Sequence, residues 1–224
     1  MTDNSTTEHH LRPADSDCRI LLPIARGVIA NTLGKQSPIV DESLWWLHEP
    51  GASFVTLSMN QHLRGCIGSL QAHRPLLLDV KANAYAAAFR DPRFSPLTLA
   101  EFDTTEIEIS LLSAQQPLQF KNENEALAQL RPMVDGVVFQ YGHYRSTFLP
   151  QVWEQLPKAE TFMSQLKQKA GLTPEFWHDD VKLYRYTVTK LKEKDMQHEA
   201  ETNREKSRGE KYSHEKNHAG SLTS

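Results

Sequence analysis

Cys66 is the residue of this sequence whose type and setting best suit covalent chemistry. It lies between Gly65 and Gly68, small residues that let a ligand or another backbone approach closely. Arg64 stands two positions earlier, so in a strand its side chain would share a face with that of Cys66. A neighbouring guanidinium favours the thiolate, the nucleophilic form of cysteine. The same spacing also suits a small core residue in a glycine-bulged hairpin, so both interpretations stay open.

A second candidate segment runs from Asp91 to Pro96, with the sequence Asp-Pro-Arg-Phe-Ser-Pro. Its two prolines stiffen a polar turn that could hold Asp91 and Arg93 at the edge of a cleft. The alternative is a helix end at which Asp91 accepts hydrogen bonds from the backbone and Arg93 forms an ordinary ion pair.

Glu106 and Glu108 would have Cα atoms roughly 6.5 Å apart on one face of a strand. That spacing permits a metal or an acid/base pair, although such alternation is also typical of a solvated face. Ten histidines occur in the chain, and none forms a close ligand pair or joins a cysteine at zinc spacing. Only His62 could lie near Cys66. We find no dinucleotide fingerprint, phosphate-binding loop or nucleophile elbow, so no metal or cofactor is expected.

These candidates need positioning by strands and helices that the apolar pattern predicts. A first helix should follow the N-cap residues Asp15 to Asp17, and its apolar series, beginning at Ile20, should stop before Gly34, although Pro23 could delay its start. Residues 53–59 and 62–70 read as two strands joined by a turn at Asn60-Gln61. The predicted helices are 74–90, 122–130, 150–156 and 159–170, and the further strands are 104–113, 136–141, 144–149 and 181–188.

Composition narrows the class of protein. The chain has 224 residues, a formal net charge of −3 and 39% hydrophobic residues, which suits one globular domain and argues against a dedicated nucleic-acid binder. Two cysteines make a disulfide framework unexpected. No apolar run approaches the roughly 20 residues of a membrane span, and the polar N-terminus does not resemble a signal peptide, so we expect a cytoplasmic protein.

Five segments together resemble the AMMECR-domain family, whose prokaryotic members are called AmmeMemoRadiSam system protein A. Leu63-Arg64-Gly65-Cys66-Ile67-Gly68 is similar to the hallmark motif of that family. The other matches are Asp91-Pro92-Arg93-Phe94 with Pro96-Leu97, Ile107-Glu108-Ile109-Ser110, Thr147-Phe148-Leu149-Pro150-Gln151-Val152, and Lys169-Ala170-Gly171-Leu172 followed by Trp177. The resemblance covers roughly residues 15 to 190.

The resemblance implies an α+β fold in which a mixed or antiparallel sheet with flanking helices forms a larger and a smaller lobe around a cleft. We expect a domain over 15–192 between a disordered N-terminus, 1–14, and a disordered charged tail, 193–224. The expected cleft residues are Leu63, Gly65, Ile67, Gly68, Arg93 and Phe94.

The family association also implies an accessory or binding role beside a Memo-like protein and a radical SAM protein. The alternative is an enzyme that uses Cys66 as nucleophile on a small or peptide substrate, with Arg64, Asp91 and Glu108 assisting.

Overall fold

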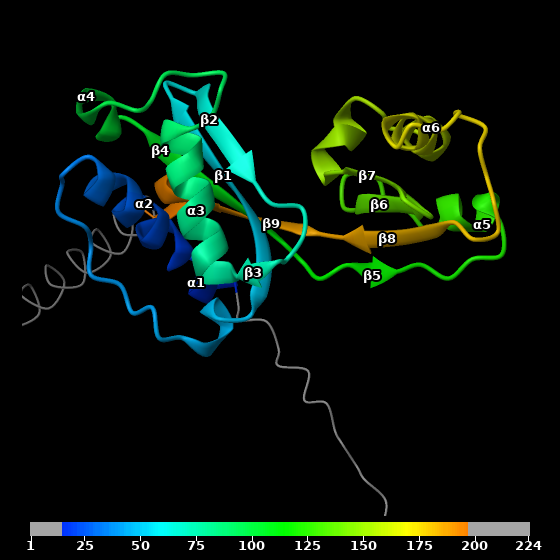
Figure 1. Cartoon of the computed structure of the whole chain (residues 1–224), viewed down its shortest axis with the longest axis horizontal. Helices are drawn as coiled ribbons and strands as arrows, with labels where there is room; N and C mark the ends of the chain where they lie inside the picture. The colour runs from blue at the N-terminus through cyan, green and yellow to red at the C-terminus, as the bar shows by residue number, and fades with distance from the viewer. Residues whose placement is uncertain (1–14, 197–224) are drawn as a thin grey trace, which may run out of the picture.

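The computed structural model describes residues 15–196, which form a larger and a smaller lobe side by side (Figure 1). The predicted disordered N-terminus, 1–14, and residues 197–224 of the predicted disordered tail, 193–224, lie outside the described residues. The larger lobe contains α1 (Asp15–Cys18), α2 (Leu21–Thr32), η1 (Trp45–Leu47), β1 (Pro50–Met59), β2 (His62–Gly68), β3 (Arg74–Pro75), α3 (Leu76–Phe89), α4 (Leu99–Phe102), β4 (Glu106–Leu112) and β9 (Val188–Lys192). The smaller lobe contains β5 (Gln116–Pro117), α5 (Glu123–Ala128), β6 (Gly136–Tyr141), β7 (Tyr144–Phe148), η2 (Pro150–Glu154), α6 (Ala159–Lys169) and β8 (Lys182–Tyr186).

The first predicted helix is split into two. The chain turns after α1, and the apolar series is carried by α2, which begins at Leu21. Pro23 lies in the first turn of α2, where its missing N–H leaves no helical hydrogen bond unmade. Gly34 follows the C-cap with a φ of 74°, as its predicted stop position requires.

An antiparallel sheet with strand order β2-β1-β4-β9 forms the centre of the larger lobe. β1 and β2 are a hairpin whose turn, Asn60-Gln61, has φ values of 50° and 65°, which confirms the predicted turn. The helix α3 covers one face of this sheet (Figure 1). Val55 and Leu57 of β1 point toward the helices and are fully buried in the core.

The hairpin contains a bulge that brings β2 against α3. Leu57 pairs with Gly65 but Ser58 pairs with Leu63, so Arg64 is the extra residue. A Cβ atom on Gly65 would lie 2.1 Å from the backbone oxygen of Ala87. Only glycine therefore fits here, and β2 packs closely against the alanine-rich part of α3.

The last predicted strand, 181–188, is wrong as a single element. β8 pairs with β6 in the smaller lobe, whereas β9 pairs with β4 in the larger lobe. Thr187 lies between them, and its N–H and C=O are bound by the hydroxyl and the N–H of Ser113, each at 2.9 Å. A sequence that alternates through both strands does not record which sheet each half joins.

β9 is followed directly by a residue that packs on the larger lobe. The carboxylate of Glu193 accepts hydrogen bonds from Arg26 Nε and from the backbone N–H of Ile107, each at 2.9 Å. Glu193, placed in the tail by the sequence, therefore anchors the end of the sheet.

The smaller lobe is built on a second antiparallel sheet with strand order β5-β8-β6-β7. Its predicted hairpin, β6 to β7, is confirmed, with Gly142 at φ 56° in the turn. Residues 150–156 were expected to be an α-helix, but the structure has the short 3-10 helix η2 there. Its Trp153 is fully buried and stacks on Phe162 of α6 at 3.8 Å between ring centroids.

Two chain segments and a small apolar cluster join the lobes. Leu112 at the end of β4 packs with Val138 of β6 and Tyr186 of β8.

Across the described residues, 15–196, none of the helices combines the length and the apolar character that a membrane span requires.

Candidate functional site

Cys66 lies on the face of the larger sheet opposite the helices. Side chains alternate along a strand, so Thr56, between the buried Val55 and Leu57, faces away from α3. Cys66 is the cross-strand partner of Thr56, and the Thr56 hydroxyl donates a hydrogen bond to its Sγ atom at 3.3 Å. Cys66 as a residue is partly exposed, whereas Cys18 is buried.

Asp91 and Arg93 close the outer edge of β2. The backbone N–H of Cys66 donates to Asp91 Oδ2 at 2.9 Å, and Arg93 Nη2 donates to the carbonyl oxygen of Cys66 at 3.2 Å. The pair therefore occupies the edge groups that a neighbouring strand would use. The two side chains also bind each other, with Nη2 2.6 Å from Oδ2 and Nε 2.9 Å from Oδ1.

These contacts fix the charge of Asp91. Its side chain is 1% exposed, and the Arg93 guanidinium beside it holds the pKa of the carboxyl well below its usual range, against the opposing effect of burial. The arrangement matches the sequence interpretation in which Asp91 binds backbone and Arg93 forms an ion pair.

Arg64 does not approach the thiol through strand alternation, because the bulge interrupts that alternation. Its Nε and Nη2 atoms donate to the two carboxylate oxygens of Glu101 at 2.9 and 3.1 Å. Glu101 also receives the N–H and hydroxyl of Thr98, forming the capping box of α4. The hydrogen bonds from Arg64 are the main cause that lowers the pKa of Glu101 to about 2. Arg64 thus ties β2 to α4.

Glu108 shares the open side of the sheet with Cys66 but is one strand further away. Thr56 pairs with Cys66 on one side and with Glu108 on the other. Two strand spacings therefore separate the backbones of Cys66 and Glu108, about 9.6 Å. Glu108 Oε2 lies 3.3 Å from Lys192 Nζ and its Oε1 lies 3.8 Å from Lys190 Nζ. The sheet brings a thiol, a hydroxyl and an ion-paired carboxylate into one row.

The remaining predicted cleft residues have different surroundings. Leu63 is 45% exposed and Ile67 packs against the core of the larger lobe. A Cβ atom on Gly68 would lie 2.2 Å from the ring of Phe54, so that ring covers the glycine. Phe94 lies beside two guanidinium groups: the centroid of its ring is 5.9 Å from Arg64 Cζ and 5.4 Å from Arg93 Cζ.

His62 does not pair with Cys66. Its ring Nδ1 lies 2.8 Å from the carbonyl oxygen of Asn60, within the exposed turn. Within residues 15–196, no group of three or more His, Cys, Asp or Glu side chains is placed to hold a metal ion.

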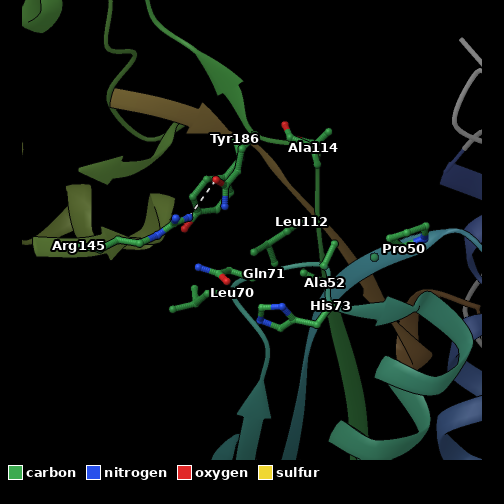
Figure 2. A pocket seen from close by; sticks show the side chains of 13 residues that line it. Pro50, Ala52, Leu70, Gln71, His73, Leu112, Ala114, Arg145 and Tyr186 are labelled. Carbon is green, nitrogen blue, oxygen red and sulfur yellow. Dashed lines mark hydrogen bonds between the residues drawn. The ribbon is translucent and has the colours of Figure 1, made fainter. Parts of the chain in front are cut away.

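The resemblance implied a cleft between the lobes, but none of the predicted cleft residues lines the two pockets described next. A pocket of about 430 Å³ lies beside the lobe junction and is lined from the larger lobe by Gln71 and His73 and from the smaller lobe by Arg145 and Tyr186 (Figure 2). A second pocket, of about 270 Å³, shares Gln71 and Arg145 and extends to Lys169. Because these residues come from separate segments, no short motif could have grouped them.

Comparisons with known proteins agree with this architecture. The chain is 34% identical over 170 residues to Protein MJ0810 of Methanocaldococcus jannaschii, covering 72% of this chain and 83% of that one. It is 37% identical over 142 residues to a protein of Thermotoga maritima, covering 62% and 76% of the two chains. The crystal structure of the uncharacterized protein PH0010 from Pyrococcus horikoshii matches with a TM-score of 0.65 and 30% identity, over 80% of this chain and 93% of that one. Since the AMMECR1 family profile also matches residues 22–191, the chain with this two-lobed fold belongs to the AMMECR1 family.

Proposed function

We propose that the chain is a cytoplasmic accessory protein that docks a partner in a modification system containing a Memo-like protein and a radical SAM protein. The docking surface is the open face of the larger sheet, on the side away from the helices. We define the open face by six residues, Thr56, Ser58, Cys66, Glu108, Ser110 and Lys190, which the strand pairing places on that side.

The observation that carries this proposal is that the charged residues of the family motifs make structural contacts around β2. Asp91 and Arg93 occupy the hydrogen-bonding edge of the strand, and Arg64 is bound by Glu101. These charged groups of the motifs therefore build and hold the strand. What the motifs leave accessible is the row of side chains on the open face, which mixes a thiol, hydroxyls, a carboxylate and a lysine.

Charge complementarity on this face gives a direct test. The purified full chain would be titrated with the Memo-like protein and with the radical SAM protein of the same organism, using isothermal calorimetry. Glu108→Lys and Lys190→Glu should each weaken binding to one of them by about tenfold or more, because reversal replaces attraction by like-charge repulsion. Lys121→Glu, an exposed position on the smaller lobe, is the matched control and should bind normally.

If neither protein binds the wild-type chain, the proposed partnership is wrong. If a partner binds but all three variants behave alike, the assignment of the open face is wrong while the partnership stands.

A second candidate function is supported by one contact. The Thr56 hydroxyl donates to the Cys66 Sγ atom, an interaction that would stabilise a thiolate used as a nucleophile. Measuring both modification and partner affinity in a reconstituted system would distinguish the two proposals. If Cys66→Ser abolishes modification while partner affinity is unchanged, Cys66 acts chemically; if both are retained, the accessory role is favoured.

A further inference from the structure

We propose that the hollow between the lobes binds a small molecule that carries one carboxylate group and an apolar body, with Arg145 as the anion receptor. We call this the interlobe site and define it by the four residues common to both interlobe pockets, Leu70, Gln71, Gln115 and Arg145. None of these residues belongs to the open face, so the inference goes beyond the proposed partner docking.

Arg145 is the only arginine that lines either pocket, and only neutral side chains hold its guanidinium in the described structure. Nη1 donates to Gln140 Oε1 at 3.2 Å and Nη2 donates to Gln115 Oε1 at 3.3 Å. With its amide turned so that the oxygen faces the guanidinium, Gln71 accepts from Nη2 and Nε at 3.3 Å each. Charge-assisted hydrogen bonds are typically shorter, about 2.7–2.9 Å. Four long hydrogen bonds to three amide oxygens thus hold this exposed guanidinium, and no carboxylate among the described residues pairs with it.

Several other arginines in the described structure have carboxylate partners. Arg64 binds Glu101, Arg93 binds Asp91 and Arg131 binds Asp135, with nitrogen–oxygen distances of 2.6 to 2.9 Å. Within residues 15–196, no Asp or Glu lines either interlobe pocket. The walls therefore present positive charge from Arg145, and from Lys169 in the second pocket, without an acidic side chain to repel an anion.

The same hollow offers apolar surface next to the guanidinium. Leu70 lines both pockets and is 39% exposed, and the larger pocket adds Pro50, Ala52, Leu112 and Tyr186. In Figure 2, Arg145 reaches across from the smaller lobe toward Gln71 and Leu70 of the larger lobe. A volume of about 430 Å³ falls within the range of small-molecule sites, roughly 300–1,000 Å³.

The charge of the site favours a carboxylate over a phosphate. A guanidinium fork matches a planar carboxylate with two parallel hydrogen bonds. The Gln71 and Gln115 side chains can turn their amide NH₂ groups toward the remaining oxygen lone pairs once a ligand takes over Arg145. The second cation, Lys169, already donates to the carbonyl oxygen of Thr147 at 2.9 Å, so one free charge suits a monoanion better than a dianion.

The test is a nuclear magnetic resonance titration of the full-length chain with benzoate, with its neutral analogue benzamide and with inorganic phosphate. We expect benzoate to cause saturable shifts of the Arg145 Nε–H and of the Gln71 and Gln115 side-chain amides. Benzamide and phosphate should bind at least about tenfold more weakly. Arg145→Gln should weaken benzoate binding by about tenfold or more, and Arg145→Lys should give an intermediate loss because it keeps the charge without the fork.

Lys182→Gln is the matched control, because Lys182 and Arg145 both pair with Gln140 from opposite sides, yet Lys182 lines neither pocket. It should bind benzoate like the wild type, and unchanged amide spectra elsewhere would establish that Arg145→Gln is folded. The proposal is overturned if benzoate shifts do not saturate, if benzamide or phosphate binds as tightly as benzoate, or if Arg145→Gln and Lys182→Gln behave alike.

Discussion

Replacing Asp91 by Asn tests whether the Asp91–Arg93 pair stabilises the strand that carries Cys66. The wild-type carboxylate is 1% exposed and accepts hydrogen bonds from the Cys66 N–H and from three donors of Arg93, at 2.6 to 3.1 Å. An Asn side chain has one oxygen for these donors and turns an NH₂ group toward the others. Each hydrogen bond to a charged group contributes roughly 1.5–3 kcal/mol to stability, and a buried donor left without a partner costs about 1–3 kcal/mol.

Arg93 is half exposed, so water can replace some of the hydrogen bonds that its guanidinium loses in the variant. The full penalty for breaking a buried ion pair therefore does not apply. We therefore expect Asp91→Asn to lower the free energy of unfolding by about 2–4 kcal/mol at pH 7. The matched control is Asp103→Asn, which removes a 73% exposed carboxylate paired with Lys35 in the same lobe. Its expected cost is about 0–1 kcal/mol.

Urea unfolding followed by tryptophan fluorescence would give the free energies, and amide hydrogen exchange at Cys66 would localise the effect to β2. The pKa of Asp91 is lowered in the folded chain, so its contribution is complete above the unfolded pKa of about 3.9 and is lost as pH falls below that value. The difference between wild type and Asp91→Asn should therefore stay constant from pH 5 to 8 and shrink below about pH 4. Equal stability of Asp91→Asn and Asp103→Asn at pH 7 would refute the edge-closing role.

Gly65→Ala should destabilise the chain by about 1–3 kcal/mol or more because its Cβ would overlap the Ala87 oxygen, whereas Gly27→Ala, whose Cβ meets nothing closer than 3.5 Å, should stabilise α2 by about 0.5–1 kcal/mol; thermal unfolding compares the two. Because the pKa of Glu101 is lowered to about 2, Glu101→Gln should lose its stability deficit relative to wild type as pH falls from above 4 toward 2, and a deficit independent of pH would contradict the ion pair with Arg64. Iodoacetamide should label one thiol per native chain, Cys66, and the buried Cys18 only in urea, as mass spectrometry of Cys66→Ser would check.

Local structure was largely predictable from local signals. The Asn60-Gln61 turn, the stop at Gly34 and the β6–β7 hairpin follow from residues that tolerate positive φ or punctuate an apolar pattern. The α+β fold class is confirmed, and the family assignment rested on contiguous motifs that the sequence displays directly.

The site was less predictable because its contacts join distant segments. The spacing of Arg64 and Cys66 suggested one shared face, but one bulge residue breaks the alternation and Glu101, 37 positions away, binds the guanidinium. A bulge depends on how two strands meet, which a single strand does not record.

The sequence by itself determined the family, the helices and strands with strong apolar periods, and the glycines on which β2 depends. Only the tertiary structure decided that residues 181–192 divide between two sheets, that Asp91 and Arg93 close the edge beside Cys66, and that Gln71, Gln115 and Arg145 meet between the lobes. Periodicity and turn chemistry act over a few residues, whereas strand pairing and lobe contacts depend on side chains tens of positions apart.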